Sequence, residues 1–318
     1  MKRISQDSGV IWCSGASRLI WCSSVLVFFC FLTIGSSAFG VDYTATSPLQ
    51  FLKIKPCRVS SLGGAFVGVN EPSFENPASL GGAKVAEIGL SYNSYLAGID
   101  ISSLSYLHPT EEMGCFGFSL LYLKTPDILK TKDGGIEDGK FSCSDISASI
   151  GYGRNISPDI AIGGTFKFIR ESIDDKAVNT GAADLGIQYR PFLKDITIGL
   201  CLSNLGKSIK YTNKKEDLPL TMKGGISVNC LDKTLLSTIE LDKSIDSDVI
   251  LRLGFENVLM NKVFLRAGYS TEADIGSGIS LGLGLKLSKY FFDMSYLPFQ
   301  DLGNTMQGSF YIKFLEEE

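Results

Sequence analysis

The stretch Ile279-Ser280-Leu281-Gly282-Leu283-Gly284-Leu285-Lys286-Leu287 decides the fold. Apolar side chains take every odd position, and small or polar side chains take every even one. Successive side chains of a β-strand point to opposite faces, so period two predicts a strand with one apolar face. The same alternation recurs in the segments 145–152, 160–168, 185–189, 196–203, 251–255, 265–269 and 310–314.

Working outward from that stretch, runs of this kind separated by turn signals fill the chain from residue 86 onward. We predict about fourteen strands, with twelve as the lower count, and each run is long enough for the roughly 9–11 residues that a membrane-crossing strand needs. The expected strands are 86–96, 98–108, 114–125, 140–156, 160–173, 182–192, 196–211, 219–231, 234–245, 248–258, 263–273, 278–289, 290–299 and 303–314. Short turns such as Ser157-Pro158-Asp159 and longer polar stretches such as 125–140 are typical of an antiparallel meander.

Two architectures can use strands with one apolar face. A soluble sandwich or solenoid would bury that face against a second layer, whereas a membrane barrel would turn it to lipid. The alternate face holds Gly, Ser, Thr, Lys, Arg and Asp, which do not form a second dry core. Tyr152, Tyr189, Tyr269 and Tyr296 fall at strand ends, where an interfacial girdle would place them. We therefore expect an all-β, antiparallel transmembrane β-barrel over residues 86–318.

The first forty residues have the organisation of a secretory signal peptide. Lys2, Arg3 and Arg18 supply positive charge, an apolar run follows at 24–34, and small residues lead up to Gly40. An uncleaved membrane anchor is the alternative, but the apolar run is shorter than the roughly 20 residues that a spanning helix needs. We expect cleavage near Gly40 and export from the cytoplasm.

Composition argues against several classes of function. The net charge is −4 and the pI is about 5.3, so no basic excess exists to bind nucleic acid. The single histidine, His108, precedes a proline, which disfavours a histidine-based enzyme or metal site. We therefore expect that the protein is not an enzyme and that it has no cofactor and no metal site. The widely spaced cysteines beyond residue 40 do not form a disulfide framework, and we expect them to pack as small side chains: Cys57, Cys115, Cys143, Cys201 and Cys230.

Residues 41–85 do not alternate, and the family resemblance given in the next paragraph implies that they form an N-terminal plug or hatch segment. A glycine pair lets the backbone turn sharply, and Pro77 holds Asn76 in extended or turn geometry. These residues either only fix the plug in place or also contact a ligand and take part in gating. The plug motif consists of Gly63, Gly64, Ala65, Phe66, Asn76, Pro77 and Ala78.

These motifs resemble the N-terminal part of the FadL-like outer-membrane family, including its PorV/PorQ-type branch. Gly63-Gly64-Ala65-Phe66 matches one family motif, and Asn76-Pro77-Ala78-Ser79-Leu80 matches another, with Ser79 where the family usually has Gly. A second likeness lies at Gly181-Ala182-Ala183-Asp184-Leu185-Gly186-Ile187-Gln188-Tyr189. The resemblance implies a fourteen-stranded barrel of the bacterial outer membrane whose lumen is plugged by the N-terminal segment.

The resemblance also implies two functions. FadL itself binds long-chain fatty acids and passes hydrophobic solutes through a lateral opening, whereas PorV-type relatives serve a secretion apparatus. We expect passage of hydrophobic small molecules such as long-chain fatty acids, with a secretion or assembly accessory barrel as the alternative. The expected partners are outer-membrane lipid, a hydrophobic ligand or an envelope protein. No ligand-binding residue can be assigned, because the strand sequences do not align recognisably with the family.

Some charged side chains lie at lumen parity, that is, at the strand positions that alternate with the apolar ones and would face the barrel lumen. They allow two interpretations. They either line a solute path or pair with one another and with the plug. The residues concerned are Asp145, Lys167, Arg190, Arg252, Glu256 and Arg266.

Overall fold

The computed structural model describes residues 49–191, 195–210, 215–245, 247–272, 277–299 and 303–314. The predicted signal peptide, 1–40, and the first part of the predicted plug, 41–48, lie outside the described residues. Within the described ranges, no helix combines the length and apolar character that a membrane span requires.

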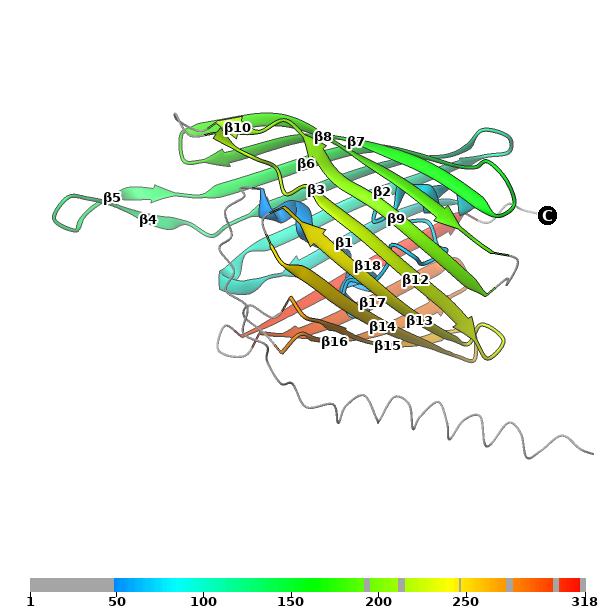
Figure 1. Cartoon of the computed structure of the whole chain (residues 1–318). Coiled ribbons are helices and arrows are strands. Elements are labelled where there is room, and N and C mark those ends of the chain that lie inside the picture. Colours follow the sequence, from blue (N-terminus) through cyan, green and yellow to red (C-terminus); the bar gives the residue numbers. More distant parts are fainter. Residues whose placement is uncertain are drawn as a thin grey trace, which may run out of the picture. The chain divides into compact units, whose positions relative to one another are not determined.

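Fourteen antiparallel strands close into a barrel (Figure 1). β1 (Ala86–Ser94) and β18 (Asn304–Phe314) close it, with Ala86 opposite Phe314. The other barrel strands are β2 (Asp100–Thr110), β3 (Gly114–Lys124), β6 (Cys143–Asn155), β7 (Ile160–Ile173), β8 (Lys176–Tyr189), β9 (Ile196–Gly206), β12 (Thr221–Cys230), β13 (Leu235–Ser244), β14 (Val249–Leu259), β15 (Val263–Ser270), β16 (Ile279–Leu287) and β17 (Tyr290–Pro298). The predicted fold class is confirmed.

Two ribbons and four short helices complete the described chain. β4 (Ile128–Lys132) pairs with β5 (Ile136–Phe141), and β10 (Ile209–Lys210) pairs with β11 (Lys215–Glu216). The helices are η1 (Gln50–Lys53), α2 (Cys57–Ser61), η2 (Pro77–Gly82) and η3 (Leu96–Gly98).

The two ends of the barrel differ. At one end, here called the turn end, short turns join β2 to β3 and β6 to β7, and the last described residue, Phe314, lies there. At the other, the loop end, longer connections such as 125–142 and 207–220 join the strands. Short turns face the periplasm and long loops face outward in outer-membrane barrels, so this asymmetry matches that class.

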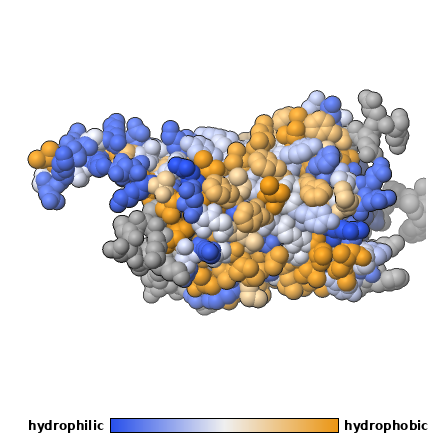
Figure 2. Space-filling model, turned by 90° about the horizontal axis from the view of Figure 1, so that it is seen from above, coloured by the Kyte–Doolittle hydropathy of each residue, from blue (hydrophilic) through white to orange (hydrophobic). Residues whose placement is uncertain are grey.

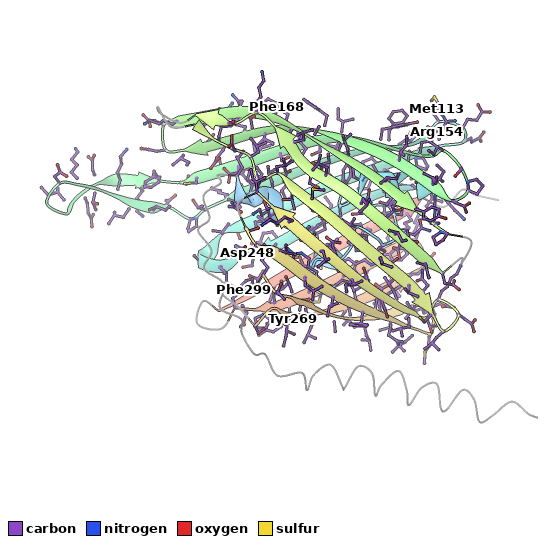
Figure 3. All side chains as sticks on the ribbon, viewed as in Figure 1. Met113, Arg154, Phe168, Asp248, Tyr269 and Phe299 are labelled. Atoms are coloured by element: carbon purple, nitrogen blue, oxygen red, sulfur yellow. The ribbon has the colours of Figure 1, made fainter. Side chains whose placement is uncertain are left out.

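The outer surface of the barrel is apolar. On β16, Leu281, Leu283 and Leu285 leave 39%, 50% and 38% of their surface exposed, while the intervening small residues face the lumen. Apolar residues form patches across the space-filled face in Figure 2, and Figure 3 shows Phe168 pointing away from the wall. Such a surface would be unfavourable in water and suits contact with lipid hydrocarbon. The sandwich alternative is wrong, because the strands close into one barrel.

The structure departs from the sequence prediction in three places on the loop side. β9 ends at Gly206 rather than at 211, and Ile209–Lys210 pairs with Lys215–Glu216 instead. β8 begins at Lys176 rather than at 182, and residues 128–141 form the β4–β5 hairpin within the stretch expected to be a loop. The early part of β8 and all of β4 lack the apolar alternation that marks the other strands. Both are held by backbone pairing beyond the apolar part of the wall, so side-chain pattern does not mark them. Figure 1 shows the hairpin projecting beyond the barrel.

The described residues 49–85, here called the lumen segment, pass through the inside of the barrel (Figure 1, blue). The segment starts at the loop end, where Leu49 and Phe51 share an apolar cluster with Ile101 and Leu123. It reaches β1 at the turn end. Its middle is fully enclosed; Leu62, Ala65, Val67 and Leu80 have no exposed surface.

Candidate functional site

Inward glycines form a seat for the lumen segment. A Cβ atom on Gly199 would collide with the Val67 backbone, and a Cβ atom on Gly268 would collide with the Gly63 backbone. On nine strands, a Cβ atom would meet the segment within 3.2 Å at Gly117, Gly151, Gly153, Gly163, Gly186, Gly199, Gly225, Gly254, Gly268 and Gly282. The small residues at lumen parity therefore make room for a buried backbone.

The glycine pair of the motif turns the segment sharply against β14 and β15. Gly63 and Gly64 have φ angles of +67° and +86°, a region that residues with a Cβ atom rarely adopt. The Gly63 carbonyl accepts a hydrogen bond from Arg252 Nη1 at 3.1 Å. The geometry matches the turning role expected for the pair.

Asn76 joins three backbone segments. Its Nδ2 donates to the carbonyls of Val67 (3.0 Å) and Ile187 (3.2 Å), and its Oδ1 accepts from the Ala78 amide (3.2 Å). Pro77 then opens η2. Ser79, which stands where the resembled family usually has glycine, donates to the Asn76 carbonyl at 2.8 Å. These contacts fix the shape of the lumen segment.

Two wall residues that the sequence analysis did not single out also hold the segment. Glu240, 1% exposed, accepts hydrogen bonds from the amides of Phe66 and Val67, both at 2.7 Å. Gln188 donates to the carbonyls of Val67 (3.1 Å) and Val69 (2.9 Å). The alternation of β13 and β8 places both side chains at lumen parity, which is the signal that could have found them.

A first ionic cluster ties α2 to the wall. Arg58 pairs with Glu256 at 2.9 Å and with Glu71, while Arg266 pairs with Glu256 and Asp293, both at 2.6 Å. Burial raises the pKa of the Glu71 carboxyl, but the adjacent Arg58 charge outweighs this and lowers that pKa to about 2. The Glu71 carboxylate therefore stays ionised at neutral pH.

A second ionic cluster holds the other side of the segment. Glu75 lies between Lys55 (2.5 Å) and Lys223 (3.0 Å). Burial opposes ionisation of Glu75, yet the two lysines hold the pKa of its carboxyl well below the usual range. Since Lys55 and Glu75 belong to the segment and Lys223 to β12, the cluster ties the two together.

Four of the six charges predicted at lumen parity are ion-paired. Arg252, Glu256 and Arg266 pair within or beside these clusters, and Lys167 pairs with Asp184 at 2.8 Å. Asp145 faces inward near the loop end and is 9% exposed. Arg190 follows β8 at the turn end and donates to Asn70 at 3.2 Å. The pairing interpretation therefore describes most of this set.

A cavity of about 440 Å³ lies between the lumen segment and part of the barrel wall. Its wall is formed by residues of β15, β16, β17, β18, β1, β2 and β3 and of the middle of β6 and β7. Apolar groups line it near the loop end, including Leu52, Ile101 and Leu121, and charged groups line it at the turn end, including Glu87 and Lys313. The lining thus runs along most of the barrel.

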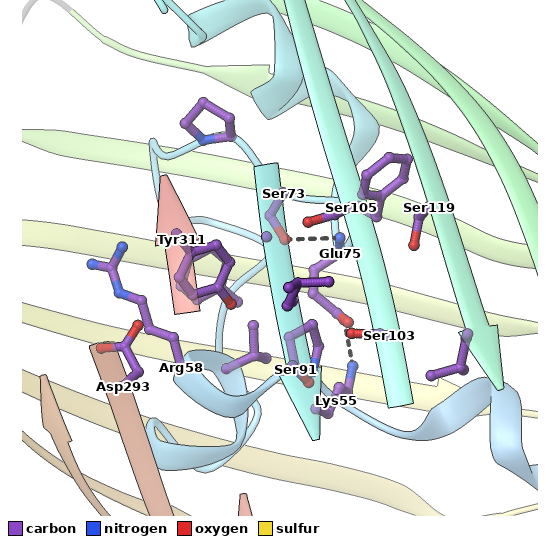
Figure 4. Close-up of a pocket in the computed structure, with 18 of the residues that line it drawn as sticks. Lys55, Arg58, Ser73, Glu75, Ser91, Ser103, Ser105, Ser119, Asp293 and Tyr311 are labelled. Carbon is purple, nitrogen blue, oxygen red and sulfur yellow. Dashed lines mark hydrogen bonds and ion pairs between the residues drawn. The ribbon is translucent and has the colours of Figure 1, made fainter. Parts of the chain in front are cut away.

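Serine hydroxyls cover the middle of the cavity wall, as Figure 4 shows for Ser91, Ser103, Ser105 and Ser119. Phe74 and Ile54 of the lumen segment also line the cavity. Among the motif residues Gly63, Gly64, Ala65, Phe66, Asn76, Pro77 and Ala78, only Phe66 is part of the lining. The other six lie outside the lining.

Across the described ranges, no group of three His, Cys, Asp or Glu side chains is placed to hold a metal ion. The five described cysteines are all free thiols. Cys57, Cys115 and Cys201 are buried, as packing requires, but Cys230 is exposed, so the expected packing role is wrong for that residue.

Solved transporters and channels share this fold. The chain is similar to the toluene transporter TodX of Pseudomonas putida, with TM-score 0.56, 12% identity, and coverage of 87% of this chain and 98% of that chain. It is similar to the CymD monoaromatic hydrocarbon channel, with TM-score 0.57, 11% identity, and coverage of 88% of this chain and 100% of that chain. It is also similar to a Pseudomonas aeruginosa FadL homologue, with TM-score 0.53, 12% identity, and coverage of 87% of this chain and 99% of that chain. No protein-family model and no curated protein matches the sequence. The resemblance to FadL-like barrels is confirmed at the level of fold, and the PorV/PorQ-type branch stays a prediction.

Proposed function

We propose that the protein is a bacterial outer-membrane barrel that lets hydrophobic small molecules pass through its lumen. The observation that carries the proposal is the cavity beside the lumen segment, whose lining reaches from the loop-end residue Ile101 to the turn-end residue Lys313. The apolar outer surface and the fold shared with transporters and channels support it. These neighbours also support a function other than catalysis.

The proposed path begins at the loop end. An apolar solute leaves water and binds against Leu52, Ile54, Ile101 and Leu121. Each Å² of apolar surface buried there stabilises the bound state by about 25 cal/mol. The lumen segment acts as the plug beside this path, and the two ionic clusters keep it seated while the solute moves along the wall.

The finer prediction from the sequence names long-chain fatty acids. Four cationic side chains of the cavity lining, Lys55, Arg58, Lys167 and Arg266, already have carboxylate partners within 3.0 Å. At the turn end, Lys313 lies 3.2 Å from Glu87. A free carboxylate would compete with existing partners at these five cations, whereas Lys286, also in the lining, has no carboxylate partner in the described ranges. Fatty acids are therefore the part of the proposal that a transport assay must separate from neutral solutes.

Transport by the purified barrel tests the proposal. Liposomes that contain the mature chain, beginning at Val41, should take up labelled toluene and oleate faster than protein-free liposomes of the same lipid. Heat-modifiable gel mobility before and after reconstitution serves as the control for a folded barrel. Equal uptake in both kinds of liposome would remove the proposed function.

The accessory role predicted from the sequence has one feature in its favour. All five residues of β4 are exposed, and the β4–β5 hairpin projects beyond the barrel where an envelope protein could bind it (Figure 1). Affinity purification from crosslinked outer membranes would test this role by comparing the full chain with a variant that lacks the hairpin. Recovery of the same proteins with both forms would count against a hairpin-bound partner.

A further inference from the structure

The cavity wall carries hydrogen-bonding groups that the protein itself does not use. Six serines form what we call the hydroxyl wall: Ser91, Ser103, Ser105, Ser119, Ser147 and Ser149. They come from four neighbouring strands, β1, β2, β3 and β6. Across the described ranges, none of the six hydroxyls takes part in a hydrogen bond with another residue. By contrast, the charged groups of the two ionic clusters are satisfied by ion pairs.

The wall is an ordered array. Ser105 lies opposite Ser119, and Ser119 lies opposite Ser149, so three strands present hydroxyls at one height. Ser91 and Ser103 form a second opposed pair one step nearer the loop end. Neighbouring strands are about 4.8 Å apart, so one small polar group can reach hydroxyls from two strands.

Two further polar side chains of the lining are buried and unpartnered. Asn93 is 3% exposed, and neither its Nδ2 nor its Oδ1 has a partner in the described part of the chain. The Thr165 hydroxyl, in a residue 4% exposed, also lacks a described partner. Buried polar groups are normally hydrogen-bonded, and specific exceptions call for an explanation. A ligand that binds in the cavity and forms hydrogen bonds with these groups explains why the protein leaves them unpartnered.

Chemistry narrows the class of ligand. A pure hydrocarbon would cover the hydroxyls without pairing them, and sites built for a substrate oxygen strongly reject analogues that lack it. A carboxylate on the wall would find Lys167, opposite Ser149, already paired with Asp184 at 2.8 Å. The next inward residue beyond Ser147 on the loop side is the acidic Asp145, which stands opposite Glu171. Serine hydroxyls both donate and accept, which suits a hydroxyl or a carbonyl group.

We propose that the cavity binds uncharged apolar molecules that carry a hydroxyl or carbonyl oxygen. The oxygen lies on the hydroxyl wall, and the hydrocarbon part lies against Leu52, Ile54 and Phe74. The cavity volume of about 440 Å³ falls in the usual range for small-molecule sites. This inference rests on the proposed passage of hydrophobic molecules and names the cargo class.

A matched series of ligands tests the inference. Labelled octane, 1-octanol and octanoate are equilibrated with the mature chain in nanodiscs, and binding to empty nanodiscs is subtracted. We expect 1-octanol to bind at least about tenfold more tightly than octane and octanoate. Equal binding of octane and 1-octanol would overturn the inference while leaving the proposed function intact. Tighter binding of octanoate than of 1-octanol would overturn the inference that the ligand is uncharged. No binding of any of the three would overturn both proposals.

Serine variants locate the effect. In S105A/S119A/S149A, 1-octanol should bind about tenfold more weakly while octane binds no more weakly than before. The control S94A/S102A/S237A removes three hydroxyls from the outward face and should bind all ligands as the original chain does. Unchanged 1-octanol binding in the inward variant overturns the inference. If that variant loses its barrel mobility, S119A alone should weaken 1-octanol binding about threefold, and an unchanged affinity has the same meaning.

Discussion

At the scale of single residues, the Asn76 side chain holds the lumen segment in its shape through hydrogen bonds. It is 1% exposed, and its amide makes three backbone hydrogen bonds. We predict that N76A destabilises the folded barrel by about 1–3 kcal/mol, because buried backbone groups lose their partner. The thermal midpoint of heat-modifiable mobility measures this. N179A, on an exposed outward position of β8, should leave the midpoint unchanged, and an equal loss in both variants would contradict the role.

Gly268 is one of the inward glycines that make room for the lumen segment, and a substitution there tests this role. An added Cβ atom would fall on the Gly63 amide, whereas a Cβ atom on Gly308 would meet nothing within 4 Å. We predict that G268A displaces the segment and raises hydrogen exchange at the amides of Phe66 and Val67 several-fold. G308A should leave exchange at those amides as it is. Slow exchange of both amides in G268A would show that the seat is looser than the contacts indicate.

Residue identity alone predicted part of the site. The motif containing Gly63 and Asn76 was found through its resemblance to a family motif, and its glycine pair and Asn-Pro step have distinctive backbone requirements. Glu240 was missed because one acidic residue in an alternating strand looks like any other lumen charge. The cavity was missed because serine has no strong pattern of its own. Only the closed register brings Ser105, Ser119 and Ser149 to one height.

At the scale of elements, Glu75 ties the segment to β12 through charge. Its pKa is lowered from the ordinary 4.5 by Lys223 and Lys55 against the effect of burial. A lowered pKa means that the carboxylate stabilises the docked segment fully above pH 4.5, and this contribution is lost as pH falls below that value. We predict that the thermal midpoint drops as pH is lowered from 5 to 3 and that E75Q lacks that part of the drop. Identical pH profiles would contradict the tie.

The β4–β5 hairpin is a separable element. Thr125 and Cys143 already close the barrel side of the connection, with the Thr125 amide donating to the Cys143 carbonyl at 3.0 Å. The exposed pair between Lys130 and Asp174 adds little, because surface ion pairs contribute about 0–1 kcal/mol. We predict that replacing residues 127–141 with two glycines shifts the thermal midpoint by less than about 4 °C. Loss of barrel mobility would show that the hairpin is needed for folding.

Element prediction succeeded where the membrane imposes a pattern. All fourteen barrel strands were expected, and β7 has its predicted bounds of 160–173, because lipid on one side and a lumen on the other enforce period two. It failed at the early part of β8 and at β4–β5, where no apolar layer selects the side chains.

At the scale of the whole molecule, glycines and serines of the inner wall have different roles. Glycines on nine strands between β3 and β16 make room for the lumen segment, and ionic clusters hold it there. Serines on β1, β2, β3 and β6 face the cavity that this placement leaves open. A barrel with a fixed inner segment can thus keep a path along one side, and that path is the basis of the proposed transport.

Filling that path is the most direct test of the account. Ser119 faces the cavity, whereas the adjacent Phe118 faces outward and is 38% exposed, so S119W and F118W place the same side chain on opposite faces of β3. Uptake of labelled toluene and 1-octanol into liposomes containing each variant is the measurement. We predict that S119W reduces uptake to the level of protein-free liposomes while F118W transports as the original chain does. Undiminished uptake by a folded S119W barrel would contradict passage along this wall.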